Sequence, residues 1–313
     1  MKNQLVMYVI ASYCALSSLM FAKIKYTGHE TVVLDGGFES KNAFINYIII
    51  GKQRYILKQK KDISQIAASA MRDSFAAYIA RNLGITHLVK IIAPEDNILG
   101  KVYQNYPATV HTIVPGVTIR NLINSKYSYL TLQLITLSKL NEKWLDTILP
   151  QISWHKQLSI MVALDLFLCN TDRHRGNIFY DESTDSFYAI DMDNIYRLNM
   201  PEIACAHLDR MIYVDKRKFT KQEIEALMIL KSTLERLLKK YTPHKLIDCL
   251  HKCAHKAGYI NLKSYVDKKI GKKIARQIAR HEEIIVQSYA SIQTFVMMLN
   301  KVINTYYKKG KVL

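Results

Sequence analysis

Three oxygen-bearing side chains near the middle of the chain, Asp172, Asn177 and Asp191, have the types and spacing of a phosphoryl-transfer site. Such a site needs one group that accepts the proton of the acceptor hydroxyl, and oxygen ligands that hold Mg²⁺ against the nucleotide phosphates. Mg²⁺ takes only a few protein oxygens and shares its remaining coordination with phosphates and water. One carboxylate and one carboxamide therefore suffice for the metal, and the second carboxylate remains for the hydroxyl.

The segments around these residues predict the elements that must position them. The apolar stretch Trp154–Cys169 has a helical pattern and leads into Asp172, whereas Phe187–Ile190 predicts a strand that ends at Asp191. A plain salt-bridged turn at Asp172–His174 is the alternative interpretation. The carboxylate directly after a predicted strand favours the metal site.

The N-terminal part of the chain predicts strands, and the remainder predicts mainly helices. β-branched and aromatic runs favour a small antiparallel sheet with turns at 35–37 and 51–52. Its predicted strands are Thr31–Leu34, Ala43–Ile50 and Tyr55–Lys58, followed by a helix over Ile63–Leu83 that stops at Gly84. Beyond Pro115, helices are expected at Leu130–Leu140, Trp144–Leu149, Trp154–Cys169, Lys221–Lys240 and Pro243–Ala257, and in two segments between Leu262 and Tyr307. The pattern predicts the α+β class.

Lys58 stands at the end of the predicted strand Tyr55–Lys58. A lysine there is costly to bury unless its ammonium group meets an anion, so Lys58 is a candidate phosphate contact. Lys60, on the same strand face, is the alternative, and either residue could instead be an ordinary exposed strand lysine.

With these parts in this order, the chain resembles the phosphatidylinositol 3/4-kinase-like branch of the protein-kinase-like fold, to which HipA-like and secretory-pathway protein kinases are related. The catalytic loop of that branch has the pattern Asp-Arg-His-x-x-Asn, which residues 172–177 match, and Ile190-Asp191 resembles its metal-binding Ile-Asp. The resemblance implies a bilobal fold, with a small β-rich N-lobe at 29–115 and a larger α-rich C-lobe at 116–313, after an apolar segment at 1–28.

The resemblance also implies the cofactors ATP and Mg²⁺, with Mn²⁺ as an alternative metal, and a role for each matching residue. The family places a glutamate on the helix after the lysine strand; that position is Ser74 here, and whether the neighbouring Asp73 pairs with Lys58 in its place stays open. Backbone N–H groups of a Gly-Gly turn would face the phosphates, and the backbone of the connection His111–Gly116 would bind adenine. The implied set is Asp172, Arg173 and His174 as catalytic residues, Asn177, Asp191 and Asp193 at the metal, and Lys58, Asp73, Gly36, Gly37 and Val114 at the nucleotide.

The net charge of +18 biases the surface toward anionic partners. A basic helix face and a basic segment after Asp191 favour an inositol lipid at an anionic membrane as the acceptor. In the family, the segment after the metal-binding aspartate contacts the substrate. The cations are Lys268, Lys269, Lys272, Lys273, Arg276 and Arg280 on the helix, and Arg197, Arg210, Lys216, Arg217 and Lys218 after Asp191. A Ser/Thr protein kinase, and a pseudokinase or binding module, are the alternatives. Nucleic acid is disfavoured because no basic stretch is interleaved with aromatic residues.

The five cysteines are odd in number and favour reduced thiols. A zinc site at Cys249, His251, Cys253 and His255 would require a loop, and the surrounding leucines favour a helix. The apolar run Leu5–Ala22 fits a cleaved signal, a short anchor or a packed helix. A compact secreted effector or a peripheral membrane enzyme is therefore expected, with a cytoplasmic enzyme as the alternative.

Overall fold

The computed structural model describes residues 32–39, 42–50, 53–84, 89–92, 106–118, 152–173, 176–181, 183–214, 218–219, 221–258 and 268–309. The apolar segment 1–28 and the helices predicted at Leu130–Leu140 and Trp144–Leu149 lie outside these residues.

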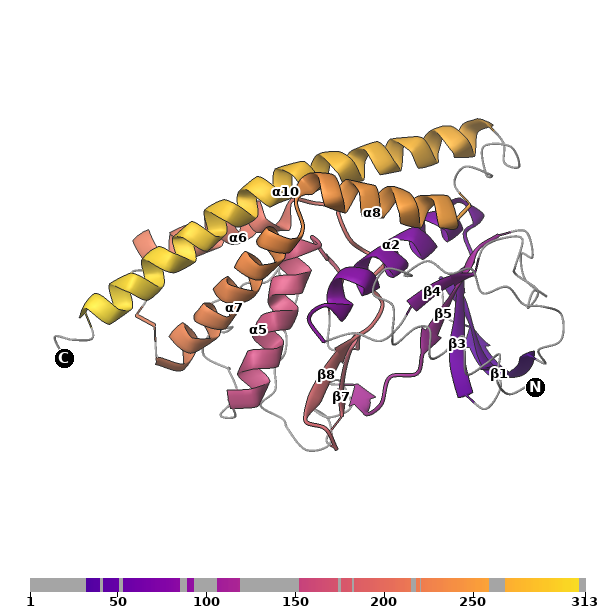
Figure 1. Cartoon of the computed structure of the whole chain (residues 1–313), viewed down its shortest axis with the longest axis horizontal. Helices are drawn as coiled ribbons and strands as arrows, with labels where there is room; N and C mark the ends of the chain where they lie inside the picture. The colour runs from indigo at the N-terminus through magenta and orange to yellow at the C-terminus, as the bar shows by residue number, and fades with distance from the viewer. Residues whose placement is uncertain are drawn as a thin grey trace. The chain divides into compact units, whose positions relative to one another are not determined.

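The described strands are β1 Val32–Glu39, β2 Ala43–Ile50, β3 Gln53–Lys60, β4 Val89–Ile92, β5 Ala108–Thr112, β6 Val117–Thr118, β7 Ile178–Asp181 and β8 Ser186–Ala189. The described helices are α2 Ile63–Arg81, α5 Ile152–Phe167, α6 Met200–Tyr213, α7 Lys221–Lys240, α8 Pro243–Lys256 and α10 Lys268–Lys309 (Figure 1). This combination of antiparallel strands and helices confirms the predicted α+β class.

The chain divides into two compact units. The first comprises Met1–Phe75, Leu88–Ile113 and Leu250–Ala275, and the second comprises Ala76–His87, Val114–Cys249 and Arg276–Leu313. The strands β1–β5 belong to the first unit, whereas β6–β8 and the helices α5, α6 and α7 belong to the second. The lobe boundary expected after residue 115 stays a prediction.

The sheet of the first unit is antiparallel, as predicted, with the described strands in the order β1-β2-β3-β5-β4. Its apolar side chains Ile48, Leu57 and Val110 are buried together. The turn expected at 35–37 is wrong: β1 runs through these residues, and the pairing with β2 shifts register between Leu34 and Gly37. A β-bulge absorbs the two glycines because a bulge needs the backbone freedom that glycine provides.

The helix α2 follows the predicted range closely. Asp62 caps its start, since the Asp62 carboxylate accepts the N–H of Ser64 at 2.9 Å. Gly84 ends the helical turn with a positive φ of 71°, which confirms the predicted stop. Phe75 and Ile79 are buried on one side of the helix.

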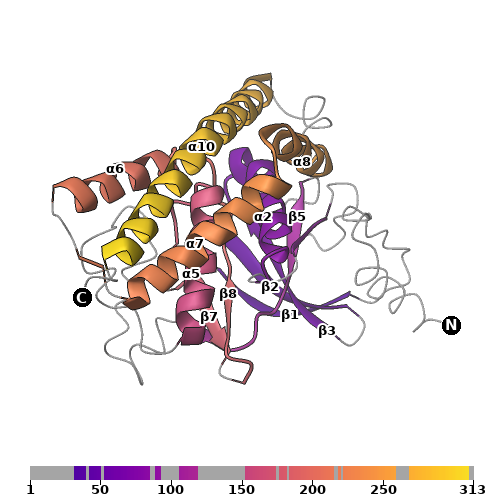
Figure 2. The same cartoon turned by 60° about the vertical axis from the view of Figure 1, so that its left-hand side comes forward.

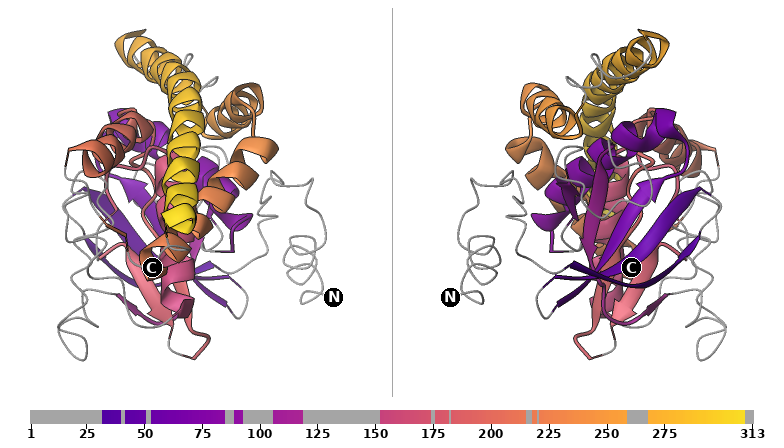
Figure 3. Two further views of the ribbon diagram at one scale, coloured as in Figure 1. Left: turned by 90° about the vertical axis from the view of Figure 1, so that its left-hand side faces the viewer. Right: turned by 90° about the vertical axis from the view of Figure 1, so that its right-hand side faces the viewer.

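The second unit is built around α5, which packs against α7, α6 and β8 (Figure 2). Every residue of 161–170 is buried, because the helix is apolar on all sides. The C-terminal region corrects the prediction of two helices, since α10 is one continuous helix of 42 residues (Figure 3). The segment expected to act as a substrate-reading loop after Asp191 turns into α6 at Met200.

The expectation that no zinc site forms on α8 has a structural reason. Cys249 and Cys253 are buried on one face of the helix, whereas His251 and His255 are exposed. The cysteines among the described residues are free thiols. In the part of the chain that the structure describes, no helix is both long and apolar enough to cross a membrane.

Candidate active site

The end of α5 forms a compact turn that presents Asp172. Cys169 adopts a positive φ of 50°, and the Asn170 side chain then links the turn to the helix. Its Nδ2 donates to Asp165 Oδ1 at 2.8 Å, and its Oδ1 accepts the Asp172 N–H at 3.1 Å. The Asp172 backbone is therefore held from both sides, while its side chain is half-buried.

Arg173 ties three segments together. Its side chain is completely buried, and its Nε donates to Asp165 Oδ2 at 3.0 Å. Its Nη1 donates to the carbonyl oxygens of Asn177 and Ile190, each at 2.9 Å. The planar guanidinium group presents several donors in a fixed arrangement, so one side chain sets the spacing of α5 and the two strands β7 and β8.

The β7–β8 hairpin carries the candidate metal ligands at its open end. Ile178 pairs with Ala189, and the Ile190 N–H donates to the Asn177 carbonyl at 3.0 Å. Asn177 and Asp191 therefore flank the last rung of the hairpin. The Asn177 Nδ2 donates to the Asp172 carbonyl at 3.1 Å, which leaves Oδ1 as the atom of the carboxamide that can bind a cation.

The opposite end of the same hairpin is held by α5. The Gln157 Nε2 donates to the Asp185 carbonyl at 2.7 Å, and its Oε1 accepts the Phe187 N–H at 2.6 Å. On the other edge, β6 pairs with β7 next to Gly116. Gly116 has a φ of 87°, and a Cβ there would lie 2.1 Å from the Tyr180 carbonyl oxygen. Gln157 therefore holds the hairpin to α5, and Gly116 lets the segment before β6 approach β7 closely.

The segment after β8 first has a strained backbone conformation, at Asp191, and then becomes buried, at Asp193. Asp191 has a positive φ of 52°, which aspartate tolerates better than most residues. Two residues later, Asp193 is buried, and the Asn194 carbonyl accepts the Thr171 N–H at 3.2 Å. The strand end thus returns to the turn that presents Asp172.

The electrostatics of this loop centre on Asp165. Burial raises the pKa of its carboxyl, and the charge and hydrogen bonds of Arg173 oppose that shift. A carboxylate without a partner in an apolar helix would be very unfavourable. Asp165 and Arg173 are therefore best understood as a pair that orients the loop.

The first unit contains a second ion pair, which is partly buried. The Lys58 ammonium donates to Asp73 Oδ2 at 3.1 Å, with exposed side-chain fractions of 12% and 2%. His111 Nε2 lies 4.0 Å from the same oxygen and 2.8 Å from Thr109 Oγ1. The Thr109 hydroxyl donates to the Lys58 carbonyl at 3.3 Å and is also hydrogen-bonded to the His111 ring. Lys58 and Asp73 thus form an ion pair, a pairing that the sequence alone left open.

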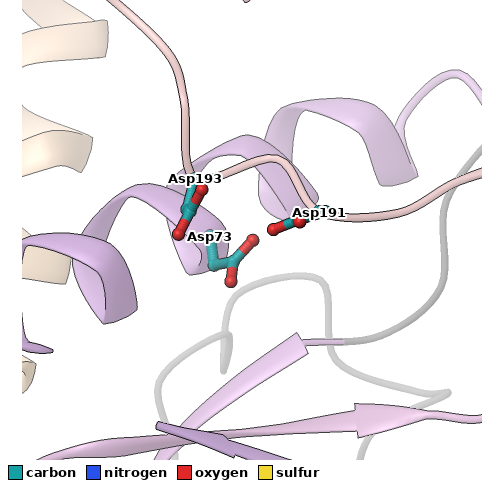
Figure 4. A group of neighbouring side chains, drawn as sticks. All are labelled: Asp73, Asp191 and Asp193. Carbon is teal, nitrogen blue, oxygen red and sulfur yellow. The ribbon is translucent and has the colours of Figure 1, made fainter. Parts of the chain in front are cut away.

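Two of the predicted metal ligands, Asp191 and Asp193, are carboxylates on the segment after β8, and Figure 4 labels them together with Asp73 of α2. Carboxylate oxygens are the hard donor type that Mg²⁺ and Mn²⁺ prefer. The donor chemistry of these carboxylates therefore fits a divalent cation.

The remaining predicted residues are placed as follows. Gly36 and Gly37 lie in β1, beside the bulge. Val114 is half-buried in the irregular segment 113–115, which follows β5. His174 lies outside the described residues.

Sequence reasoning missed three residues of these networks, Asp165, Asn170 and His111. Asp165 carried a usable signal, since an acidic residue inside an otherwise apolar helix must meet a cation or polar partners. The side chains of Asn170 and His111 gave no such signal in the sequence, because asparagine in a turn and histidine in a strand are common without any function.

Comparison with known proteins shows the fold. No protein-family model matches the chain, and no curated protein sequence matches it. The solved structures that resemble it include a Helicobacter pylori proinflammatory kinase, CtkA, at 13% identity and a TM-score of 0.50, covering 88% of this chain and 96% of that one. A Plasmodium vivax ethanolamine kinase aligns at 12% identity and a TM-score of 0.31, covering 83% of this chain and 82% of that one. The likeness to the first of these confirms the predicted bilobal, protein-kinase-like fold.

Proposed function

We propose that the protein is an ATP-dependent and Mg²⁺-dependent kinase. The observation that carries the proposal is the Arg173 cross-link, which holds the backbone of Asn177 and of Ile190, the residue before Asp191, on one rigid support. Phosphoryl transfer depends mainly on positioning and on charge stabilisation. A buried arginine that fixes the backbone of Asn177 and of the residue before Asp191 supports the first requirement.

Each side chain has a role in this proposal. Asp172, with His174 beside it in the sequence, orients the acceptor hydroxyl and accepts its proton, and the cross-linked Arg173 keeps that loop in place. Asn177 and Asp191 hold the metal, assisted by Asp193. When bound, Mg²⁺ neutralises charge on the phosphates that it shares with these oxygens.

The nucleotide is held by residues of the first unit and by the segment after it. The Lys58 ammonium meets the phosphates, and Asp73 orients that ammonium through the ion pair at 3.1 Å. Backbone N–H groups of Gly36 and Gly37 on β1 approach the phosphates, and the backbone at Val114 binds adenine. The assignments of Lys58, Gly36, Gly37 and Val114 follow the family resemblance through their order in the chain, whereas Asp73 stands one residue before the family's glutamate position.

For the acceptor, we propose an inositol lipid at an anionic membrane, as in the phosphatidylinositol 3/4-kinase-like branch. The net charge of +18 favours such a surface. The segment between Asp193 and α6 is short, and its Ile195 and Tyr196 are buried. The Tyr196 N–H donates to the Leu168 carbonyl at 3.0 Å. The exposed residues of this segment are Arg197 and Leu198, and the cationic Arg197 favours an anionic headgroup.

The test is a transfer assay with purified protein, Mg²⁺ and labelled ATP. We expect phosphate on phosphatidylinositol in mixed anionic vesicles, and we expect Asp172→Ala and Asp191→Ala each to abolish it. Asp185→Ala is the matched control, because Asp185 also has a positive φ, of 48°, but lies at the far end of the same hairpin. Activity that survives in Asp191→Ala would contradict the metal site. Transfer to protein substrates alone would contradict the lipid acceptor and identify a Ser/Thr protein kinase.

A further inference from the structure

Tyr241 joins the helix that carries Asp73 to the helix that leads into Asp172. The residue lies between α7 and α8 and is only 4% exposed. Its N–H donates to the Leu237 carbonyl at 2.8 Å, and Thr242 next to it accepts the Leu246 N–H at 3.0 Å through its carbonyl. Both hydrogen bonds belong to helix ends, so the backbone at Tyr241 is fixed from either side.

The ring of Tyr241 contacts two aromatic side chains from different helices. Its centroid lies 6.1 Å from that of Tyr78 on α2, edge-on at 76°, and 6.2 Å from that of Phe167, the last residue of α5. Aromatic pairs in such geometries contribute beyond their buried area. Phe167 is also the residue whose carbonyl accepts the Tyr196 hydroxyl at 3.3 Å, so Tyr241 packs on the base of the loop that presents Asp172.

The hydroxyl group of Tyr241 binds the C-terminal end of α2. The Asn82 Nδ2 donates to it at 2.5 Å and also to the Tyr78 carbonyl at 2.9 Å, while the Lys240 ammonium donates to Asn82 Oδ1. Burial, followed by the nearby Tyr78 and Cys249, raises the pKa of Tyr241, which keeps the hydroxyl neutral. Asn82 therefore ties the end of α2 to both the backbone of its own last turn and the end of α7.

We propose that Tyr241 is a positioning residue for the Lys58–Asp73 pair, a role that rests on the proposed kinase function. Asp73 precedes Tyr78 by little more than one turn of the same continuous helix, and a helix transmits displacement along its axis almost rigidly. The contacts of Tyr241 with the C-terminal half of α2 therefore restrict the displacement of Asp73. Because the same ring packs on Phe167, α2 and the Asp172 loop share one support.

The test compares Tyr241→Phe with Tyr289→Phe. Tyr241→Phe keeps the ring and its packing but removes the hydroxyl that accepts from Asn82 and is hydrogen-bonded to Tyr78. Tyr289→Phe removes a similar tyrosine hydrogen bond, from the Tyr289 hydroxyl to the Leu238 carbonyl at 2.9 Å, which ties α10 to α7 without touching α2. The two variants should lose comparable stability, so a difference between them reports on position and not on folding.

Kinetics on the full chain give the first readout. We expect Tyr241→Phe to lower kcat/KM for ATP about fivefold, the effect of losing one hydrogen bond that the active arrangement needs, with the KM for phosphatidylinositol vesicles unchanged. Tyr289→Phe should change neither value. Equal kinetic constants in the two variants, or a loss in Tyr241→Phe that falls on the lipid KM, would overturn the proposal.

Amide hydrogen exchange gives a readout that needs no activity. In Tyr241→Phe the amides of 74–81 should exchange about fivefold faster than in the wild type, whereas in Tyr289→Phe they should keep the wild-type rate. Unchanged exchange in 74–81 would overturn the positioning role even if activity fell. Should the wild type transfer phosphate to no acceptor, the proposed function would fail, and the exchange rates would still decide whether Tyr241 holds α2.

Discussion

Two ion pairs among the described residues differ in how deeply they are buried. Arg173 and Asp165 are both essentially inaccessible, with side-chain exposed fractions of 0% and 1%, and the guanidinium also donates to two backbone carbonyls. In the other pair, Lys58 keeps 12% of its side chain exposed and donates to Asp73 at 3.1 Å. One pair is enclosed, and the other reaches the surface of its unit.

The difference in burial suits the two pairs to different tasks: one holds a loop in place, and the other can interact with an incoming anion. A guanidinium that bonds a carboxylate and two carbonyls at fixed angles cannot leave without disrupting three segments. An ammonium group is a compact charge that can share its carboxylate partner with an incoming anion. The enclosed pair is therefore suited to hold the loop of Asp172 and Asn177, and the partly exposed pair is suited to meet phosphate.

The largest effect is expected when the enclosed pair is broken. Arg173→Leu leaves Asp165 buried without its cation and should lower the free energy of unfolding by about 3–5 kcal/mol, measured by urea denaturation. Adding Asp165→Leu to Arg173→Leu should recover part of that stability, because no buried charge then remains. The double variant should still lack kinase activity, since the carbonyls of Asn177 and Ile190 have lost their donor. Near-wild-type stability of Arg173→Leu would refute the assignment of a supporting pair.

Exchanging the two cations tests the comparison directly. Lys58→Arg keeps the charge beside Asp73, so unfolding should change little, while phosphoryl transfer should fall by about 10²-fold because the larger fork displaces the phosphate contact. Arg173→Lys should instead clearly lower the free energy of unfolding, because one ammonium group cannot reach Asp165 and both carbonyls. Equal losses of stability in the two exchanges would show that the pairs do not differ in kind.

A smaller effect is expected where the backbone supports the hairpin. Gly116→Ala places a Cβ 2.1 Å from the Tyr180 carbonyl at a φ of 87° and should destabilise the protein by about 1–3 kcal/mol, measured by thermal unfolding. Gly84→Ala is the control, since its φ is 71° but nothing lies within 4 Å of the added atom, and about 1 kcal/mol is expected. If the control lost as much as Gly116→Ala, the close approach of β6 to β7 would not matter.

The smallest effect is expected beside the partly exposed pair. Thr109→Val removes the hydroxyl that links His111 to the Lys58 carbonyl and should cost about 1 kcal/mol in the free energy of unfolding. The free energy of unfolding of Thr109→Val is measured by urea denaturation and compared with that of Thr112→Val, a substitution on the same strand. A loss of several kcal/mol in Thr109→Val would mean that the Lys58 side of the molecule is as rigid as the Arg173 side.

Much of the fold could be predicted because the local signals agreed with the final structure. The antiparallel sheet, α2 with its stop at Gly84, and α7 over Lys221–Lys240 all follow from periodicity and turn residues. The errors arose where local signals allow two outcomes. A Gly-Gly pair can form a turn or a bulge, and strand pairing with β2 selected the bulge. The single helix α10 replaced two, and its apolar residues Ile285, Ile292 and Leu299 are buried at the spacing of one helix face.

The sequence by itself determined which side chains could do chemistry. Asp172, Asn177 and Asp191 have the types and spacing for phosphoryl transfer, and Asp73 stood next to the position where a partner for Lys58 was needed. These properties are local, so they survive without knowledge of distant contacts.

Only the tertiary structure decided how those side chains are supported. Asp165 and Arg173 form an ion pair at the end of α5. Tyr241 contacts Tyr78 and Asn82, which are far from it in the sequence. Hydrogen bonds and ring contacts of this kind depend on which elements pack together, and packing is set by the burial of many side chains at once. The candidate chemistry is therefore readable from residue types, whereas its positioning is a property of the folded chain.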